Sequence, residues 1–198
     1  MLEAPASALL VEAFANTVDV EEGTDDLSTP AQLADWLWER GLTDRHRRVG
    51  AEDHELCLRL RAGIREELGT HVGDGADAAV LAAADAALRE LPVLVTVGGG
   101  ASAPVPQLPP ARQALARLAI AWAELIATGE AHRLKRCAEH SCAWAFWDVS
   151  KNRSRRWCSM RVCGNRTKAR KHAAKQAAAA GADTPPASTR AATTEVRP

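Results

Sequence analysis

Residues 137–163, CAEHSCAWAFWDVSKNRSRRWCSMRVC, contain four of the five cysteines of the chain in the pattern C-x4-C-x15-C-x4-C. The two close pairs, Cys137 with Cys142 and Cys158 with Cys163, are separated by one loop, so four thiolates can occupy the corners of a tetrahedron. This closed geometry is typical of structural zinc and leaves no coordination position open for catalysis. We therefore predict one structural Zn²⁺ ion held by these four cysteines. An iron–sulfur cluster and disulfides stay open as alternatives, because C-x2-C is the commoner zinc spacing.

The residues between the two cysteine pairs predict a β-hairpin. Alternation places Trp144 and Phe146 on one face of a strand, and Ala145 and Trp147 on the other. The residues that follow, up to the second cysteine pair, begin with a polar, turn-like stretch and end in Arg-Arg-Trp, which we expect to form the return strand of the hairpin.

A basic helix is predicted directly after Cys163, over the sequence GNRTKARKHAAKQ. The exposed N–H groups and the positive dipole end of a helix N-terminus favour a thiolate at that position. Two knuckles, a hairpin and a helix that begins at the last ligand describe a treble-clef-like zinc finger with four cysteine ligands. We assign this module to residues 131–176.

The formal net charge of zero conceals a polarised chain. Residues 1–130 carry 10 Lys/Arg and 21 Asp/Glu, a net charge of −11, whereas residues 131–175 carry 13 Lys/Arg and 2 Asp/Glu, a net charge of +11. An acidic body with a basic module fits a polyanion-binding head on a carrier or sensor domain. The alternative is that the two parts attract each other.

Nucleic acid is the partner that the basic module favours. The predicted contacts lie on the hairpin and on the basic helix, and they are Arg153, Arg155, Arg156, Arg166, Lys168, Arg170, Lys171 and Lys175. Arg133, Lys135 and Arg136 form a third basic group before the first ligand. DNA is the first hypothesis. RNA, stacked on an exposed tryptophan, and an acidic protein partner are the alternatives.

Residues 1–130 are predicted to form one mainly helical domain with a small β-hairpin, so the fold class is α+β. This domain has apolar residues for a core of its own, and we expect it to stay folded without zinc. Residues 6–18 do not decide between helix and strand, and the tail 177–198 is predicted to be disordered. The expected helices cover 30–40, 51–68, 76–91 with Asp74 as cap, and 110–128, and the expected hairpin strands cover 93–97 and 105–108.

Several classes of protein are disfavoured. The N-terminal stretch MLEAPASALLVEAFAN lacks the basic residues of a signal peptide, and no segment is long enough to span a membrane, so we expect a cytoplasmic protein. Paired cysteines in that compartment more often bind a metal than form disulfides. We expect no enzyme, because there is no Ser/His/Asp or Cys/His arrangement with a recognisable spacing. Gly98, Gly99 and Gly100 lack the lysine of a phosphate-binding loop.

The cysteine module resembles the CGNR zinc-finger family, which takes its name from the tetrad at residues 163–166. The resemblance extends to RLKRC at 133–137 and CSM at 158–160, and all four cysteines match. It implies a zinc-bound module that contacts DNA.

The N-terminal part resembles, more loosely, the ABATE domain that commonly precedes this finger. The similar positions are FANT at 14–17 and Thr29-Pro30 followed by Leu33 and Trp36. Members of this family resemble bacterial stress-induced transcription regulators. The resemblance implies a sensing or ligand-binding domain, with a small-molecule effector and a homodimer as further expectations.

Overall fold

The computed structural model describes residues 3–44, 47–98 and 101–182. Its helices are α1 (Ala6–Ala15), α2 (Pro30–Glu39), α3 (Ala51–Thr70), α4 (Ala78–Arg89), α5 (Pro110–Ala127) and α6 (Asn165–Ala182). Three antiparallel two-stranded ladders join β1 (Val18–Asp19) to β2 (Thr24–Asp25), β3 (Val93–Leu94) to β4 (Ala103–Pro104), and β5 (Leu134–Arg136) to β6 (Ala145–Trp147). A 3₁₀ turn, η1 (Ala131–Arg133), precedes β5, and a π-helical turn, η2 (Met160–Gly164), precedes α6.

The predicted α+β class, mainly helical with a small hairpin, is confirmed. The helix expected from Pro30 is α2, and its cap is Thr29, whose hydroxyl accepts a hydrogen bond from the backbone N–H of Gln32 at 3.2 Å. Gly41, at φ +64°, follows its end. Residues 6–15, which the sequence left undecided, form α1.

One predicted cap was wrong. Asp77, and not Asp74, caps α4, because its carboxylate accepts from the N–H groups of Ala79 and Val80 at 2.8 and 3.3 Å. The Asp74 side chain instead lies 3.5 Å from Arg136, at the start of the cysteine module. Both aspartates precede the helix, and position relative to the first turn decides which of them caps it.

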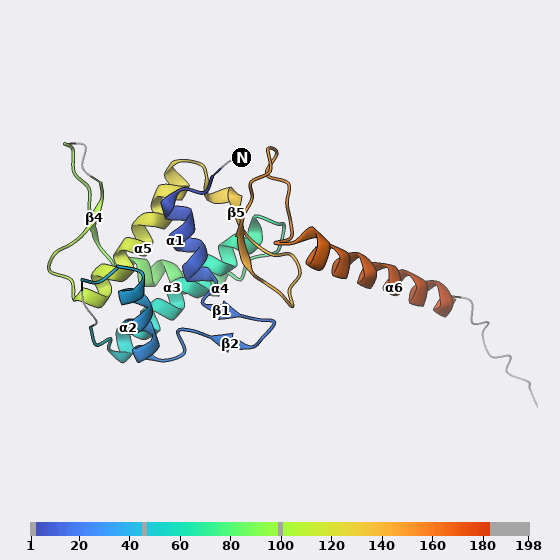
Figure 1. The fold of residues 1–198 in the computed structure, drawn as a ribbon, viewed down its shortest axis with the longest axis horizontal. Helices are drawn as coiled ribbons and strands as arrows, with labels where there is room; N and C mark the ends of the chain where they lie inside the picture. The colour runs from blue at the N-terminus through green and yellow to red at the C-terminus, as the bar shows by residue number, and fades with distance from the viewer. Residues whose placement is uncertain (1–2, 45–46, 99–100, 183–198) are drawn as a thin grey trace, which may run out of the picture.

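The hydrophobic core lies between α1, α3 and α5 (Figure 1). Val11 and Phe14 of α1 belong to one buried cluster with most leucines of α3 and α5, namely Leu56, Leu60, Leu68, Leu115, Leu118 and Leu125. Helices α3 and α4 also cross closely, since a Cβ added at Gly63 would stand 2.0 Å from the Ala84 Cβ. None of the helices in the described part of the chain combines the length and the apolar character that a membrane span requires.

The β3–β4 hairpin was predicted with a longer return strand at 105–108, but its second strand is Ala103–Pro104. The hairpin projects from the helical body (Figure 1) and carries exposed apolar side chains, with Val95 80% and Val97 107% exposed. Gly99 and Gly100 lie outside the described residues.

Part of the predicted disordered tail is helical. Helix α6 runs to Ala182, so residues 177–182 are helical and not disordered. Residues 183–198 lie outside the described part of the chain. Figure 1 shows α6 extending from the body as a single projecting arm.

The hairpin of the cysteine module differs from the prediction in its pairing. Strand β6 pairs with β5, with Leu134 opposite Trp147, and not with residues 155–157. The predicted faces are confirmed, because Ala145 and Trp147 join the main core whereas Phe146 packs against the cysteines. The sheet of the module therefore completes the core of the helical domain.

A second tie joins the two parts. The Asn16 side chain, at the end of α1, donates to the carbonyl of Ala145 at 2.9 Å and accepts from its N–H at 2.7 Å. The Arg65 guanidinium of α3 also donates to the carbonyls of Ala15 and Ala143. These bonds and the shared core lead us to expect one cooperative unit, in place of the independent N-terminal domain that the sequence favoured.

Trp147→Ala is expected to lower the free energy of unfolding of the whole chain by about 3–5 kcal/mol, the usual cost of emptying a buried aromatic site. Helical circular dichroism and tryptophan fluorescence should lose signal at the same urea concentration. Trp144→Ala, at an exposed position of the same module, serves as the control and should cost far less. Two separate transitions, with the helical one unchanged, would contradict a shared core.

Candidate metal centre and basic helix

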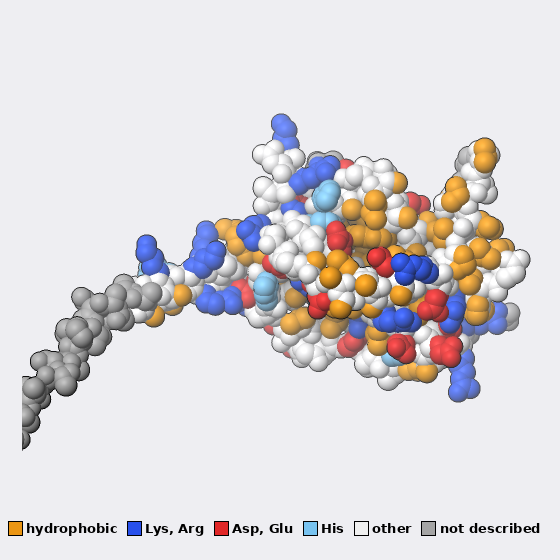
Figure 2. All heavy atoms as spheres, turned by 180° about the vertical axis from the view of Figure 1, so that it is seen from behind, with side chains coloured by type: hydrophobic (Ala, Val, Ile, Leu, Met, Phe, Trp, Pro, Cys, Tyr) orange, Lys and Arg blue, Asp and Glu red, His pale blue; other side chains and the backbone are white. Residues whose placement is uncertain are grey.

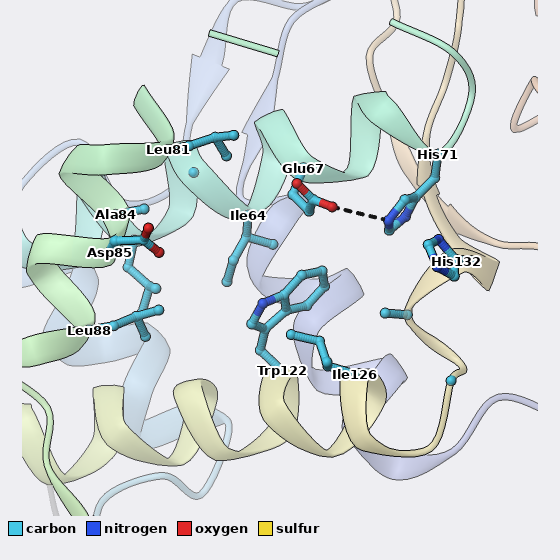
Figure 3. A pocket seen from close by; sticks show the side chains of 14 residues that line it. Ile64, Glu67, His71, Leu81, Ala84, Asp85, Leu88, Trp122, Ile126 and His132 are labelled. Carbon is cyan, nitrogen blue, oxygen red and sulfur yellow. Dashed lines mark ion pairs between the residues drawn. The ribbon is translucent and has the colours of Figure 1, made fainter. Parts of the chain in front are cut away.

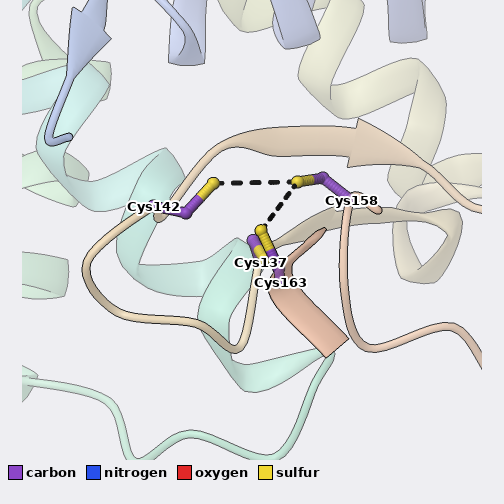
Figure 4. Close-up of side chains that lie close together, drawn as sticks. All are labelled: Cys137, Cys142, Cys158 and Cys163. Atoms are coloured by element: carbon purple, nitrogen blue, oxygen red, sulfur yellow. Dashed lines mark hydrogen bonds between the residues drawn. The ribbon is translucent and has the colours of Figure 1, made fainter. Parts of the chain in front are cut away.

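The four predicted ligands converge. The Sγ atoms of the four cysteines all lie within 4.8 Å of one another (Figure 4). Cys158 Sγ lies 3.7 Å from Cys142 Sγ and 3.6 Å from Cys163 Sγ. A tetrahedral zinc ion with bonds of about 2.3 Å requires sulfurs about 3.8 Å apart. The donor set therefore fits a tetrahedral thiolate-bound metal, and all five cysteines are free of disulfides.

The first knuckle is fixed by β5 and β6. Cys137 directly follows β5, and its N–H donates to the carbonyl of Trp144 at 2.8 Å, which continues the ladder. The chain then turns at Glu139, whose carbonyl accepts from the N–H groups of Cys142 and Ala143, both at 2.9 Å. Ala143 has φ +50°, a left-handed conformation that turns the chain into β6.

The second knuckle is the π-helical turn η2. The hydroxyl of Ser159 accepts from the N–H of Val162 at 3.3 Å and caps the turn, which carries Cys163 at its end. A Cβ at Gly164 would stand 2.5 Å from the sulfur of Met160, so the flexible and exposed Met160 side chain would have to move. The glycine of the CGNR tetrad thus leaves room for the Met160 side chain at the entry into α6.

Burial makes the metal-free sulfurs weak acids. It raises the pKa of Cys163 to about 11 and that of Cys158 further still, and the nearby Cys137 and Cys142 reinforce both shifts. Ionisation of four adjacent thiols, two of them buried and two half-buried, requires a compensating cation. The chemistry of the donor set is therefore that of a metal site, with four sulfur ligands and no open position.

Glu139 is the functional residue that the sequence interpretation missed. It lies between the first two ligands, is fully buried, and its carboxylate accepts from Arg170 and, at 3.1 Å, from the Thr167 hydroxyl of α6. The Arg170 hydrogen bond, with those from Ser141 and Thr167, lowers the pKa of Glu139 to about 2. A buried carboxylate thus fixes the basic helix to the first knuckle. The sequence did contain a clue to its role, because Glu139 is one of only two acidic residues in the otherwise basic segment 131–175.

Two faces of α6 differ in what they contact. Arg166 and Arg170, one turn apart, lie toward the body, where Arg166 pairs with Glu21 at 2.8 Å. Lys168, Lys171 and Lys175 follow at spacings of three and four residues and occupy the opposite face. All three are exposed, and within the described part of residues 3–182 their side chains have no described partner. Figure 2 shows the basic side chains along this arm.

The hairpin arginines are divided in the same way. Arg155 stacks over Phe146 at 4.9 Å and donates to the Cys158 carbonyl, so it holds the second knuckle. Arg153 donates to the carbonyl of Gly129 at 3.1 Å. Arg156 is exposed, and its guanidinium has no hydrogen-bond or ion-pair partner among the described residues. Among these three predicted contacts, Arg156 is therefore the side chain that remains available for a phosphate.

The basic group before the first ligand is internal. Arg133 and Lys135 are buried, and Arg136 lies 3.3 Å from Glu66 and 3.5 Å from Asp74 of the helical domain. Arg136 therefore joins the module to the helical domain, whereas Lys135 is bonded within the module. The three cations do not form the third polyanion-binding group that the sequence suggested. A run of basic letters does not distinguish a buried ion pair from a solvated one.

Asp148 is the partner of the buried Lys135. The Lys135 ammonium donates to the Asp148 carboxylate at 2.8 Å and to the backbone carbonyl of Arg155 at 2.9 Å. Burial alone would raise the pKa of Asp148, but Lys135 and the hydrogen bonds from Ser150 and Arg155 outweigh it and lower that pKa to about 2. This pair fixes the loop between the two knuckles.

The fold and the site together define a helical domain whose core is completed by a tetracysteine module with a basic helix. The two parts match two known families in the same order. Residues 133–176 match the CGNR zinc finger, and residues 9–129 match the ABATE family, described as "Putative stress-induced transcription regulator". The chain belongs to this family of ABATE proteins with a C-terminal CGNR zinc finger. A search of curated proteins found no match.

Asp148→Asn should destabilise the protein by about 3–5 kcal/mol, because it leaves the buried Lys135 ammonium without its counter-charge. Chemical denaturation measures the loss. Glu22→Gln, at an exposed carboxylate, is the control and should change stability by less than about 0.5 kcal/mol. An unchanged midpoint for Asp148→Asn would show that this ion pair is not needed for folding.

Removal of one sulfur ligand tests the metal centre. Cys142→Ser, or treatment of the wild type with a chelator, is expected to abolish stoichiometric metal and to lower the thermal midpoint of the helical domain as well, since β5 and β6 complete its core. Elemental analysis and circular dichroism provide the two measurements. Cys57→Ser alters a buried cysteine outside the cluster and should retain the metal. A helical domain with an unchanged midpoint after metal loss would contradict the coupling.

Proposed function

We propose that this protein is a bacterial, cytoplasmic transcription regulator that binds duplex DNA through α6. The observation that carries the proposal is the lysine stripe of α6, formed by Lys168, Lys171 and Lys175, on a helix that projects from the body and is anchored at its first turns by Glu139. The family match to a transcription regulator supports the same class of function.

One structural Zn²⁺ held by the four cysteines is part of the proposal. When bound, the ion supplies the charge that lets the buried sulfurs ionise, and it holds the two knuckles together. The residues of the chain do the rest. Glu139 orients α6 through Arg170 and Thr167, and Arg155 holds the backbone of the second knuckle.

A single projecting helix has the dimensions that the major groove of B-DNA admits. Lysines act on phosphates as flexible point charges, whereas Arg166 and Arg170, the residue type that most often binds guanine edges, are engaged with Glu21 and Glu139. We therefore propose that phosphate contacts supply most of the affinity, with Arg156 as a further contact. Three or four such contacts predict a loss of affinity of about 40- to 150-fold between 50 and 200 mM salt.

The two alternatives have less support. Trp147 is buried in the core, and Trp157 is half-buried with its indole N–H donating to Thr167 at 3.2 Å, so both are poor platforms for the stacking of unpaired RNA bases. Trp144 is the exposed tryptophan of the module, and binding to hairpin RNA tests it. An acidic protein partner would use the same lysine stripe, and a test with nucleic acid distinguishes it.

A homodimer would bring two lysine stripes to one duplex. The exposed Val95 and Val97 of the β3–β4 hairpin support self-association, because soluble proteins rarely leave such apolar arms uncovered. An effector acting through the N-terminal domain is also part of the proposal.

Lys168→Ala with Lys171→Ala tests the function. We expect the slope of log affinity against log salt to fall by about 2 and the affinity at low salt to drop by at least roughly tenfold. Fluorescence anisotropy with labelled duplex DNA, hairpin RNA and heparin measures both quantities. Arg48→Ala with Arg89→Ala removes two exposed charges away from α6 and should leave binding unchanged. Equal affinity of the α6 variant and the wild type for duplex DNA would overturn the proposal.

A further inference from the structure

A cleft of about 320 Å³ opens between α3, α4 and α5 and is closed at one end by η1 (Figure 3). Its walls are mostly apolar, with Ile64 from α3, Leu88 from α4 and Trp122 from α5 facing one another. This volume lies at the lower end of the range for small-molecule sites, which combine apolar walls with a few convergent polar groups. The close crossing of α3 and α4 at Gly63 and Ala84 forms part of its lining.

The polar side chains of the cleft are two carboxylates and two imidazoles, from Glu67, Asp85, His71 and His132. Glu67 and His71 stand at one end, and the Asp85 carboxylate stands toward the other (Figure 3). The His71 side chain is only 4% exposed, and its Nδ1 lies 2.8 Å from the carbonyl of Leu134, so Nδ1 carries the proton. The remaining nitrogen, Nε2, therefore presents a lone pair when the ring is neutral.

His71 and Glu67 do not form a hydrogen bond with each other when the imidazole is neutral. Burial lowers the pKa of His71, and the neighbouring His132, whose ring centroid is 4.8 Å away, reinforces the shift. At neutral pH the Nε2 lone pair thus faces the Glu67 carboxylate at 3.5 Å with no proton between them. With the ring neutral, Nε2 of this 4% exposed side chain accepts a hydrogen bond from no described protein donor, so a donor on a bound molecule would satisfy it.

The cleft is poorly suited to a metal ion. Within the described residues, the cysteine cluster is the group of three or more His, Cys, Asp and Glu side chains whose ligand atoms come close enough to hold an ion, so Glu67 and His71 would offer a metal only two ligands. The missing donor is therefore a molecule with an apolar body, which Trp122 and Ile64 can contact, and a group that carries N–H bonds and positive charge. The face of an indole also favours a cation.

We propose that this cleft binds a protonated organic amine with its ammonium group at Glu67 and His71, and that the bound amine stabilises the zinc finger. This goes beyond DNA binding by α6, and it deepens the proposed function by naming the chemical class of its effector.

The connection to the finger is short. His71 donates to the carbonyl of Leu134, the first residue of β5, and Cys137 follows β5 directly. His132, which lines the cleft, belongs to η1, the turn that leads into the same strand. A ligand that fixes His71 and His132 therefore also fixes the strand that carries the first metal ligand.

The test uses the full-length, zinc-loaded protein and three probes with the same ring and chain: 2-phenylethylamine, 2-phenylethanol and phenylacetate. Calorimetry or ligand-observed NMR should detect saturable binding of the amine and much weaker binding of the alcohol and the acid. Glu67→Gln should weaken amine binding roughly ten- to a hundredfold, the effect of losing one charge-assisted hydrogen bond. Glu55→Gln, at an exposed position of the same helix, should bind the amine as the wild type does.

The second readout is the rate at which a chelator removes zinc. The amine should slow zinc release from the wild type and from Glu55→Gln but not from Glu67→Gln. Equal binding of amine and alcohol, unchanged binding by Glu67→Gln, or zinc release that ignores the bound amine would each overturn the proposal. Neither readout involves DNA, so a failure of α6 to bind duplex DNA leaves these results unaffected and is recognised separately by the lysine variants.

Discussion

One constraint governs the C-terminal half of the molecule: four sulfur atoms must converge from two knuckles that different parts of the fold hold in place. The first knuckle is an extension of the β5–β6 sheet, whose inner face packs into the main core. The second is the capped turn η2, which continues directly into α6. The position of the basic helix relative to the helical domain therefore depends on the sulfur cluster and on the buried Glu139 beside it.

The positive charge of residues 131–175 serves two purposes that the structure separates. Buried or half-buried cations, such as Lys135 and Arg155, hold backbone carbonyls and the carboxylate of Asp148. Exposed cations, such as Lys171, face solvent along α6. The two acidic residues of the segment both lie inside it, each against a cation, so the charge that remains at the surface is almost wholly positive.

Much of the candidate site was predictable from the sequence because its chemistry is local. The cysteine spacing predicted the cluster, and the alternation around Phe146 predicted which side chains share a face, although only the structure shows that the Phe146 face meets the sulfurs and the face of Ala145 and Trp147 meets the core. The pairing of β6 was not predictable in this way. Residues 134–136 and 155–157 are both short, basic and flanked by a cysteine, and only packing against the helical domain selects the former.

The roles of individual charges were beyond the sequence for a related reason. Whether a cation of α6 faces the body or solvent depends on where Glu21 and Glu139 lie in three dimensions, since these carboxylates pair with Arg166 and Arg170. The cleft between α3, α4 and α5 was equally hidden, because His71 and Trp122 come from distant parts of the chain and neither belongs to a motif.

The shared core also has a consequence for how such proteins can diversify. A finger excised near residue 131 would expose Leu134, Ala145 and Trp147, which the helical domain now covers. Gene fusion could not simply move this module onto an unrelated protein, because the module does not have a complete core of its own. The fingers of a zinc-finger array that fold independently can be moved in this way. New binding preferences in this lineage would instead have to arise by substitution along the outward face of the arm, with both halves inherited together.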